Sequence, residues 1–177
     1  EGKNLSLTEF WSITGSVARL ANNADDYASF YHETEGGKVS HKEVHNLYGY
    51  NMVRAASEYF GKYDKDKRTL IYSRSSHIGM HRYGGIWTGD NASRWDHLLL
   101  NLKMLPSLNM CGFLYVGADI GGFGQDTTED LLLRWTALGA FVPLMRNHCT
   151  FGSRRQEYYR FGNRQAFKNL LDMRYSL

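Results

Sequence analysis

The chain has 177 residues and a formal net charge of +3, with 42% hydrophobic and 14% aromatic residues. This length suffices for one domain with a sizeable core, but a complete eight-stranded α/β barrel takes about 250 residues. The basic residues are dispersed, whereas a nucleic-acid-binding protein carries them clustered on one face.

The cysteine count, the N-terminal residues and the apolar runs bear on where the protein is located. Two cysteines, Cys111 and Cys149, do not make a disulfide framework. No signal peptide opens the chain, and no apolar run reaches the roughly 18 residues of a membrane span. We therefore expect a cytoplasmic protein with no nucleic-acid and no membrane partner.

The first 40 residues predict little regular structure. Apolar residues between Leu7 and Ala21 fit a helical stripe that Gly15 interrupts, and a glycine pair at 36–37 marks a loop. Ser40 followed by Glu43 is a capping box, which predicts the start of a helix. Apolar residues at three- and four-residue steps continue this helix to about residue 61.

Each of four short apolar runs predicts a β-strand that leads into a charged residue. The runs cover residues 69–73, 86–89, 113–118 and 141–145, and they lead into Arg74, Asp90, Asp119 and Arg146, respectively. Ionic side chains at the carboxyl ends of successive parallel strands are how a (β/α) barrel builds its active site. The chain therefore looks like part of an enzyme.

Helices are expected after three of these strands, over residues 93–105, 127–138 and 163–173. Ser93 can cap the first of them, and Pro106 should end or kink it. Asp126 and Glu129 form a capping-box pattern for the second, and Gly139 should stop it. The alternation favours a parallel sheet covered on both faces, either a small open α/β sheet or a piece of a barrel.

Asp90 is the first candidate for catalysis. It follows Trp87-Thr88-Gly89, and a carboxyl beside a large indole is partly desolvated, which raises its pKa and lets it deliver a proton near neutrality. The alternative is that Asp90 caps the next helix and that Trp87 belongs to the core.

Asp119 lies in a glycine-rich stretch, residues 117–124, that lets backbone approach a ligand closely. Two carboxylates on neighbouring strand ends suggest a general acid with a base or nucleophile. The competing hypothesis is a phosphate-binding loop, although the Gly-Lys-Ser/Thr ending of such loops is missing. Arg74 and Arg146 could hold a carboxylate ionised or bind ligand hydroxyls, and His148 could donate to a hydroxyl.

Two other groups of residues could carry chemistry. Cys149 follows His148, which raises a Cys–His nucleophile, but no orienting group is nearby in sequence. His41 and His45 have the spacing of zinc ligands on a helix, but the residues between them fit neither zinc-enzyme motif. We expect no metal and no cofactor.

Five short motifs follow one another over residues 43–157. They are His45-Asn46-Leu47-Tyr48-Gly49, Ser73-Arg74-Ser75, Trp87-Thr88-Gly89-Asp90-Asn91, Gly117-Ala118-Asp119-Ile120-Gly121-Gly122-Phe123 and Arg146-Asn147-His148. Together, and in this order, they closely resemble glycoside hydrolase family 31, the α-glucosidase family.

The resemblance implies a (β/α)8 TIM barrel and a retaining α-glucosidase that hydrolyses terminal α-linked glucose from oligosaccharides. By its match, Asp90 is the general acid/base, and Asp119 becomes a hydroxyl binder instead of a catalyst. The residues expected to bind the nonreducing-end sugar are Arg74, Trp87, Asp119, Phe123, Arg146 and His148.

One departure from the family pattern concerns the nucleophile. The family carries it in a Trp-x-Asp-Met-Asn-Glu motif on the fourth barrel strand, and this chain has no such motif. We therefore expect the chain to supply about strands 5–8 of a single catalytic domain. Residues 1–40 would follow strand 4, and residues 41–177 would form the C-terminal half barrel.

A half barrel has consequences for partners and activity. Its free sheet edges favour association, with the missing N-terminal half or as a homo-oligomer. The isolated fragment should be inactive because retention needs a second carboxyl. The alternatives are a noncatalytic carbohydrate-binding or assembly fragment, and an unrelated open α/β hydrolase that uses Asp90 and Asp119.

Overall fold

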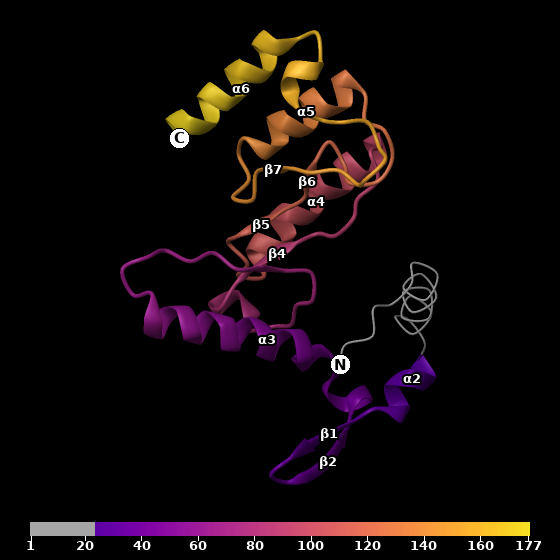
Figure 1. The fold of residues 1–177 in the computed structure, drawn as a ribbon, viewed down its shortest axis with the longest axis vertical. Helices are drawn as coiled ribbons and strands as arrows, with labels where there is room; N and C mark the ends of the chain where they lie inside the picture. Colours follow the sequence, from indigo (N-terminus) through magenta and orange to yellow (C-terminus); the bar gives the residue numbers. More distant parts are fainter. Residues whose placement is uncertain (1–23) are drawn as a thin grey trace, which may run out of the picture. The chain divides into compact units, whose positions relative to one another are not determined.

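The structure is a computed structural model, and it describes residues 24–177 (Figure 1). The chain divides into two compact units whose boundary falls between Tyr48 and Gly49. The helical stripe expected over residues 7–21 lies outside the described residues.

A β-hairpin lies in the described part of the first unit. It follows a short helix, α2 (Ala24–Ser29), and pairs β1 (Tyr31–Thr34) antiparallel with β2 (Gly37–Ser40). Gly37 closes the turn with a φ of 109°, a conformation that glycine adopts without steric cost. The loop predicted at residues 36–37 is thus a tight turn.

A histidine pair joins this hairpin to the start of helix α3 (His41–Tyr63). His32 Nε2 and His41 Nδ1 are 2.8 Å apart, and the rings of His41 and His45 are 5.4 Å apart. Burial lowers the pKa of His41, and the neighbouring His32 and His45 lower it further. Within residues 24–177, no group of three or more His, Cys, Asp or Glu side chains is arranged to hold a metal ion.

The second unit contains five short strands, and all their pairings are parallel. β3 (Tyr72–Ser73), β4 (Gly85–Trp87) and β5 (Val116–Gly117) form one sheet in that order. β6 (Asp119–Ile120) pairs with β7 (Arg146–Asn147). The backbone of Leu144 donates to the carbonyl of Val116 at 3.3 Å, which links the two sheets. The parallel arrangement predicted from the alternating elements is confirmed.

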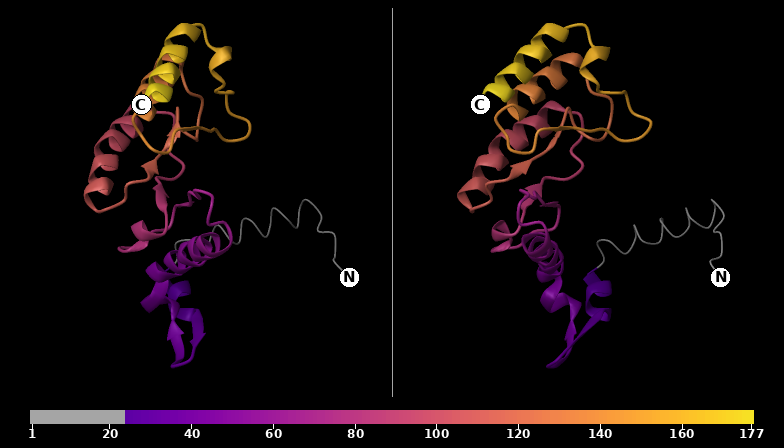
Figure 2. Two further views of the ribbon diagram at one scale, coloured as in Figure 1. Left: turned by 90° about the vertical axis from the view of Figure 1, so that its left-hand side faces the viewer. Right: turned by 60° about the vertical axis from the view of Figure 1, so that its left-hand side comes forward.

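Helices and loops cover these strands. The main helices are α4 (Trp95–Met110), α5 (Glu129–Gly139) and α6 (Arg164–Ser176), and two short 3-10 helices are η1 (Met80–Arg82) and η2 (Tyr158–Arg160). Figure 2 shows α4 and α6 on one side of the strands and the loop after β7 on the other. None of the helices in the described residues is long and apolar enough to cross a membrane.

All four predicted strands have different bounds from those expected. The runs at 69–73 and 86–89 give only β3 at 72–73 and β4 at 85–87. The run at 113–118 gives only β5, and after Ala118 the chain turns to a new partner and continues as β6. The run at 141–145 is a turn and a short extended segment, because the amides of Phe141 and Val142 still bond to carbonyls at the end of α5. The strand begins at Arg146. Asp119 and Arg146 therefore lie within strands and not beyond them.

The helix starts also differ from the expected caps. Ser93 does not cap α4, because its hydroxyl donates to the carbonyl of Gln125 and Arg94 occupies the cap position. Thr128 caps α5 by accepting from the amide of Leu131 at 3.3 Å. Pro106 lies inside α4, which continues to Met110, so this proline does not end the helix.

Two apolar clusters form the core of the second unit. One joins α3 and α4 to β4 and β5, and its buried members are Val53, Met80, Ile86, Leu105, Phe113, Val116 and Val142. The other joins α5 and α6 to β6, and its buried members are Ala118, Ile120, Leu131, Leu132, Trp135, Phe161 and Phe167. Burial of these side chains supplies the main driving force for folding.

We expect Gly85→Ala to destabilise the second unit by about 1–3 kcal/mol, because overpacked side chains force the backbone to move. A Cβ at Gly85 would lie 2.0 Å from the carbonyl oxygen of Tyr115, which is backbone of the neighbouring strand. The matched control is Gly61→Ala in α3, where a Cβ meets nothing within 4 Å. That change should be neutral or stabilise by about 0.5–1 kcal/mol. The measurement is the midpoint of urea unfolding. Equal midpoints for Gly85→Ala and Gly61→Ala would contradict the close packing of Gly85 against Tyr115.

Candidate active site

An ion pair between adjacent strands lies at the centre of the site. Asp119 of β6 and Arg146 of β7 are partners in the strand register, and Arg146 Nε donates to Asp119 Oδ1 at 2.9 Å. The Asp119 side chain is fully buried, whereas the guanidinium is about half exposed. A buried carboxylate needs such a cation, because an unpaired charge is costly to remove from water.

The indole of Trp87 connects this ion pair to a second one. The guanidinium carbon of Arg74 lies 4.4 Å from the Trp87 ring centre, and that of Arg146 lies 5.4 Å from it. Arg74 in turn pairs with Asp90 at 2.9 Å. Cations within about 6 Å of an aromatic face are attracted to it. The two carboxylates, the two arginines and the indole thus form one continuous line of contacts.

A network of side-chain amides supports the loop that carries Asp90. Asn91 donates to Thr88 Oγ1 at 3.0 Å, and Thr88 donates to Asn101 on α4 at 2.9 Å. The amide of Asn101 closes the ring by donating to Asn91 at 3.0 Å. Gly89 has a φ of 90°, so the turn before Asp90 requires glycine. Buried polar groups that are fully hydrogen-bonded in this way rigidify their surroundings.

Asp90 itself is more exposed than the sequence suggests. Its side chain is 45% exposed, so the indole next to it in sequence does not desolvate it. It does not cap α4 either, since Arg94 takes that position. The carboxyl is therefore accessible to an incoming ligand and is held by Arg74.

Two further loops bring Phe123 and His148 together. Their rings lie 5.2 Å apart at an angle of 33°. The amide of Thr150 bonds to the carbonyl of Phe123 at 2.9 Å, and the amide of Phe123 bonds to the carbonyl of Asn91 at 2.7 Å. The loops after β4, β6 and β7 are thus joined to one another by their backbones.

The protonation of Asp119 reflects two opposing influences. Burial raises the pKa of this carboxyl above its ordinary value, while Arg146 and His148 act to lower it. Its second oxygen, Oδ2, is buried and has no hydrogen-bond partner among the described residues, and the same holds for the indole nitrogen of Trp87. A free carboxylate oxygen is an acceptor for a ligand hydroxyl.

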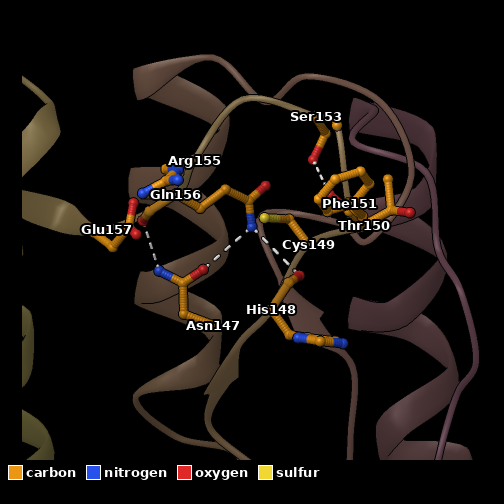
Figure 3. Close-up of a pocket in the computed structure, with 10 residues that line it drawn as sticks. Asn147, His148, Cys149, Thr150, Phe151, Ser153, Arg155, Gln156 and Glu157 are labelled. Atoms are coloured by element: carbon orange, nitrogen blue, oxygen red, sulfur yellow. Dashed lines mark hydrogen bonds between the residues drawn. The ribbon is translucent and has the colours of Figure 1, made fainter.

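A hollow of about 580 Å³ adjoins His148 and is lined by residues 147–153 and 155–157 (Figure 3). The Cys149 sulfur and the His148 imidazole point in opposite directions there. This geometry does not support a Cys–His nucleophile, which requires hydrogen-bond reach between the two groups.

The structure brings together every residue that the sequence analysis proposed for the site. Asp90, Arg74, Trp87, Arg146 and Asp119 form the line of contacts, and His148 and Phe123 stand beside it. Such a group offers carboxylates for proton transfer and hydroxyl binding, guanidinium donors, and aromatic faces for a sugar ring. A phosphate loop is disfavoured, since Asp119 places a carboxylate in the glycine-rich stretch.

Sequence reasoning missed three supporting residues. Asn91 and Asn101 hold the Asp90 loop, and Gln156 contacts the ends of β6 and β7. Asn91 enters the sequence analysis only as part of a motif, Asn101 lies in the helix predicted over residues 93–105, and Gln156 lies in a segment with no recognisable pattern. Asn101 follows Leu98 by three residues and precedes Leu105 by four, so it is an amide on the apolar face of that helix. This position is the one sequence signal, and the side chain is 0% exposed.

Comparisons with known proteins agree on one family. The family described as the glycosyl hydrolases family 31 TIM-barrel domain matches residues 6–177. The chain is 40% identical over 146 residues to alpha-glucosidase 2 of Bacillus thermoamyloliquefaciens, covering 81% of this chain and 19% of that protein. It is 44% identical over 140 residues to rat lysosomal alpha-glucosidase, covering 78% and 15%.

Solved structures give the same result. The glucosidase II alpha subunit in its Tris-bound form has a TM-score of 0.72 at 35% identity, over 78% of this chain and 15% of that one. A family 31 dextranase from Flavobacterium johnsoniae, complexed with glucose, has a TM-score of 0.73 at 27% identity, over 87% and 20%. The chain thus spans about a fifth or less of the length of these relatives, and its partial sheet belongs to a (β/α)8-barrel fold.

Replacing Asp119 with asparagine should change how stability depends on pH. Because burial raises the pKa of the folded carboxyl above 3.8, the folded state holds this proton more tightly than the unfolded chain does. The contribution of Asp119 to stability is therefore fully present below the unfolded pKa and is lost as the pH rises through the raised folded pKa. Relative to the unaltered chain, Asp119→Asn should gain stability as the pH rises through that window.

The measurement is the free energy of unfolding in urea between about pH 3 and pH 7. Asp172→Asn serves as a control, because this residue is exposed on α6 and forms an ion pair with Lys168. A stability difference between the Asp119→Asn chain and the unaltered chain that stays constant across the range would contradict the raised pKa.

Proposed function

The chain belongs to glycoside hydrolase family 31, and from this premise we propose that it forms the acid/base side of a retaining α-glucosidase site. The observation that carries the proposal is the line of contacts from Asp90 through Arg74, Trp87 and Arg146 to Asp119. The substrate class is an oligosaccharide that ends in α-linked glucose. Relatives named as alpha-glucosidases support this choice.

Asp90 acts as the general acid/base in this proposal. In a retaining reaction the acid protonates the glycosidic oxygen as it leaves, and the resulting carboxylate then takes a proton from the water that attacks the glycosyl-enzyme. Both steps need a carboxyl that reaches the ligand and keeps its orientation. The exposure of Asp90 and the amide network under its loop meet these needs, and Arg74 pairs with the carboxylate form that acts in the second step.

The sugar at the nonreducing end binds to the remaining residues of the site. The unpartnered Oδ2 of Asp119 accepts from a hydroxyl, and Arg146 pairs with the other oxygen of the same carboxylate. His148 and Arg74 supply donors to other hydroxyls. The rings of Trp87 and Phe123 offer apolar faces to the sugar carbons. Asp119 is thus a binding residue in this proposal and not the nucleophile.

The nucleophile is proposed to come from outside this chain. A retaining glycosidase needs a second carboxyl about 5–5.5 Å from the first, and the sequence has no Trp-x-Asp-Met-Asn-Glu motif to provide it. We assign the chain to about strands 5–8 of the barrel, with strands 1–4 supplied by the remainder of the catalytic domain. Without that remainder, the chain is a carbohydrate-binding half site.

The isolated chain should not turn over 4-nitrophenyl α-D-glucopyranoside, because no glycosyl-enzyme can form without the nucleophile. Release of nitrophenol and mass spectrometry of the intact chain are the measurements. A burst of nitrophenol together with a covalent hexose adduct on this chain would sink the half-site assignment.

In the complete barrel, Asp90→Asn should abolish hydrolysis of maltose or isomaltose, since their leaving groups need protonation, while glucose still binds. A loss of about 10²–10⁴-fold in kcat is expected for removal of a general acid. The matched control is Asp96→Asn, an exposed aspartate of α4 that also pairs with an arginine, Arg94. It should retain the unaltered rate. Disaccharide hydrolysis by the Asp90→Asn enzyme at the unaltered rate would contradict the assignment of Asp90 as the general acid/base.

A further inference from the structure

We propose that Gln156 is a positioning residue for the sugar site, because its side-chain amide ties the end of β6 to the end of β7. It thereby sets the geometry of Asp119 and Arg146, which stand one residue earlier in those strands. This inference rests on the proposed function, in which these two residues bind the sugar.

Gln156 contacts both strand ends directly. Its Nε2 donates to the carbonyl of Ile120 at 3.0 Å and to Asn147 Oδ1 at 3.1 Å, and the carbonyl of His148 lies 3.4 Å away. Asn147 returns a bond from its Nδ2 to the Gln156 carbonyl at 2.8 Å. Figure 3 shows the bonds from the Gln156 amide to Asn147 and to the carbonyl of His148. The side chain is 3% exposed, so solvent does not compete for them.

The surroundings fix which way the amide points. Three acceptor oxygens face its nitrogen, and a flipped amide would set its own oxygen against all three. The observed orientation leaves Gln156 Oε1 buried without a hydrogen-bond partner. A buried acceptor without a hydrogen-bond partner lowers the stability of the fold. Stability alone therefore does not favour a glutamine at this position.

The strand register places Gln156 opposite the ion pair. Asp119 pairs with Arg146, and the next pair along is Ile120 with Asn147. Because successive residues of a strand point to opposite faces, the ion pair holds the two strands on one face and Gln156 holds them on the other. Gln156 is therefore proposed to act on the sugar through the residues it positions.

Gly121 shows how closely this amide is packed. A Cβ there would lie 2.7 Å from Leu132 and 3.0 Å from Gln156 Nε2. The chain turns at Gly121 with a φ of 87°, directly after the strand that Gln156 fastens. The Gln156 amide is therefore tightly packed. A change in this side chain should displace the ends of β6 and β7.

The test uses Gln156→Leu and Gln156→Glu in the complete barrel, with 4-nitrophenyl α-D-glucopyranoside as substrate. Gln156→Leu keeps the bulk but loses the donors, so kcat/KM should fall about tenfold, chiefly through a higher KM. Gln165→Leu is the control, because Gln165 is exposed on α6 and bonds to Asn169. It should behave as the unaltered enzyme.

Gln156→Glu gives a signature that a simple packing defect would not. An ionised carboxylate faces three oxygens and is repelled, whereas its protonated form can donate one hydrogen bond. Activity relative to the unaltered enzyme should therefore recover as the pH falls. A kcat/KM for Gln156→Leu equal to that of the control, or a defect in Gln156→Glu that is independent of pH, would overturn the inference.

A second measurement separates this inference from the proposed function. NMR titration of the Asp119 carboxyl in the chain itself should differ between Gln156→Leu and the unaltered sequence, and not between Gln165→Leu and the unaltered sequence. If the unaltered enzyme fails to hydrolyse the glucoside, the proposed function is wrong. The titration of Asp119 then still tests whether Gln156 positions this carboxyl. An Asp119 titration unchanged by Gln156→Leu would then overturn the positioning role.

Discussion

The structure depends on the ion pair that Asp119 and Arg146 form across two parallel strands. Both residues occupy strand positions, so the hydrogen-bond register and the charge pairing are one constraint. A slip of either strand would leave a fully buried carboxylate without its cation, which costs several kcal/mol. The same guanidinium faces Trp87 and so extends the constraint to the pair of Arg74 and Asp90.

Binding and proton transfer are built differently in this site. Asp119 is buried and held within the sheet, as suits a residue that must recognise a fixed pattern of hydroxyls. Asp90 stands on a loop, half exposed, and is oriented by Arg74 and by the amides of Asn91 and Asn101. Each carboxylate therefore has the surroundings that its proposed role requires, although both share one indole as a neighbour.

The sequence located the charged candidates at the strand ends because an apolar run followed by a charge is a local pattern, whereas Phe123 entered the expected site only through the family resemblance. The sequence could not predict the division of residues 113–120 between two partners, since that depends on contacts with residues 27 or more positions away. Gln156 was missed for the same reason, as it contacts Ile120 across 36 residues. Local capping signals failed at Ser93 because its hydroxyl bonds to the distant Gln125.

The change of strand partner at Ala118 limits the insertions and deletions that the gene can tolerate. Val116 and Gly117 pair with β4, and Asp119 and Ile120 pair with β7, so a single connecting residue keeps two registers in phase. Inserting or deleting one codon in this stretch would reverse the faces of the side chains beyond it and turn Ile120 toward the face that Asp119 occupies. Natural length variation among homologous genes should therefore avoid residues 116–120 and collect in the surface loops.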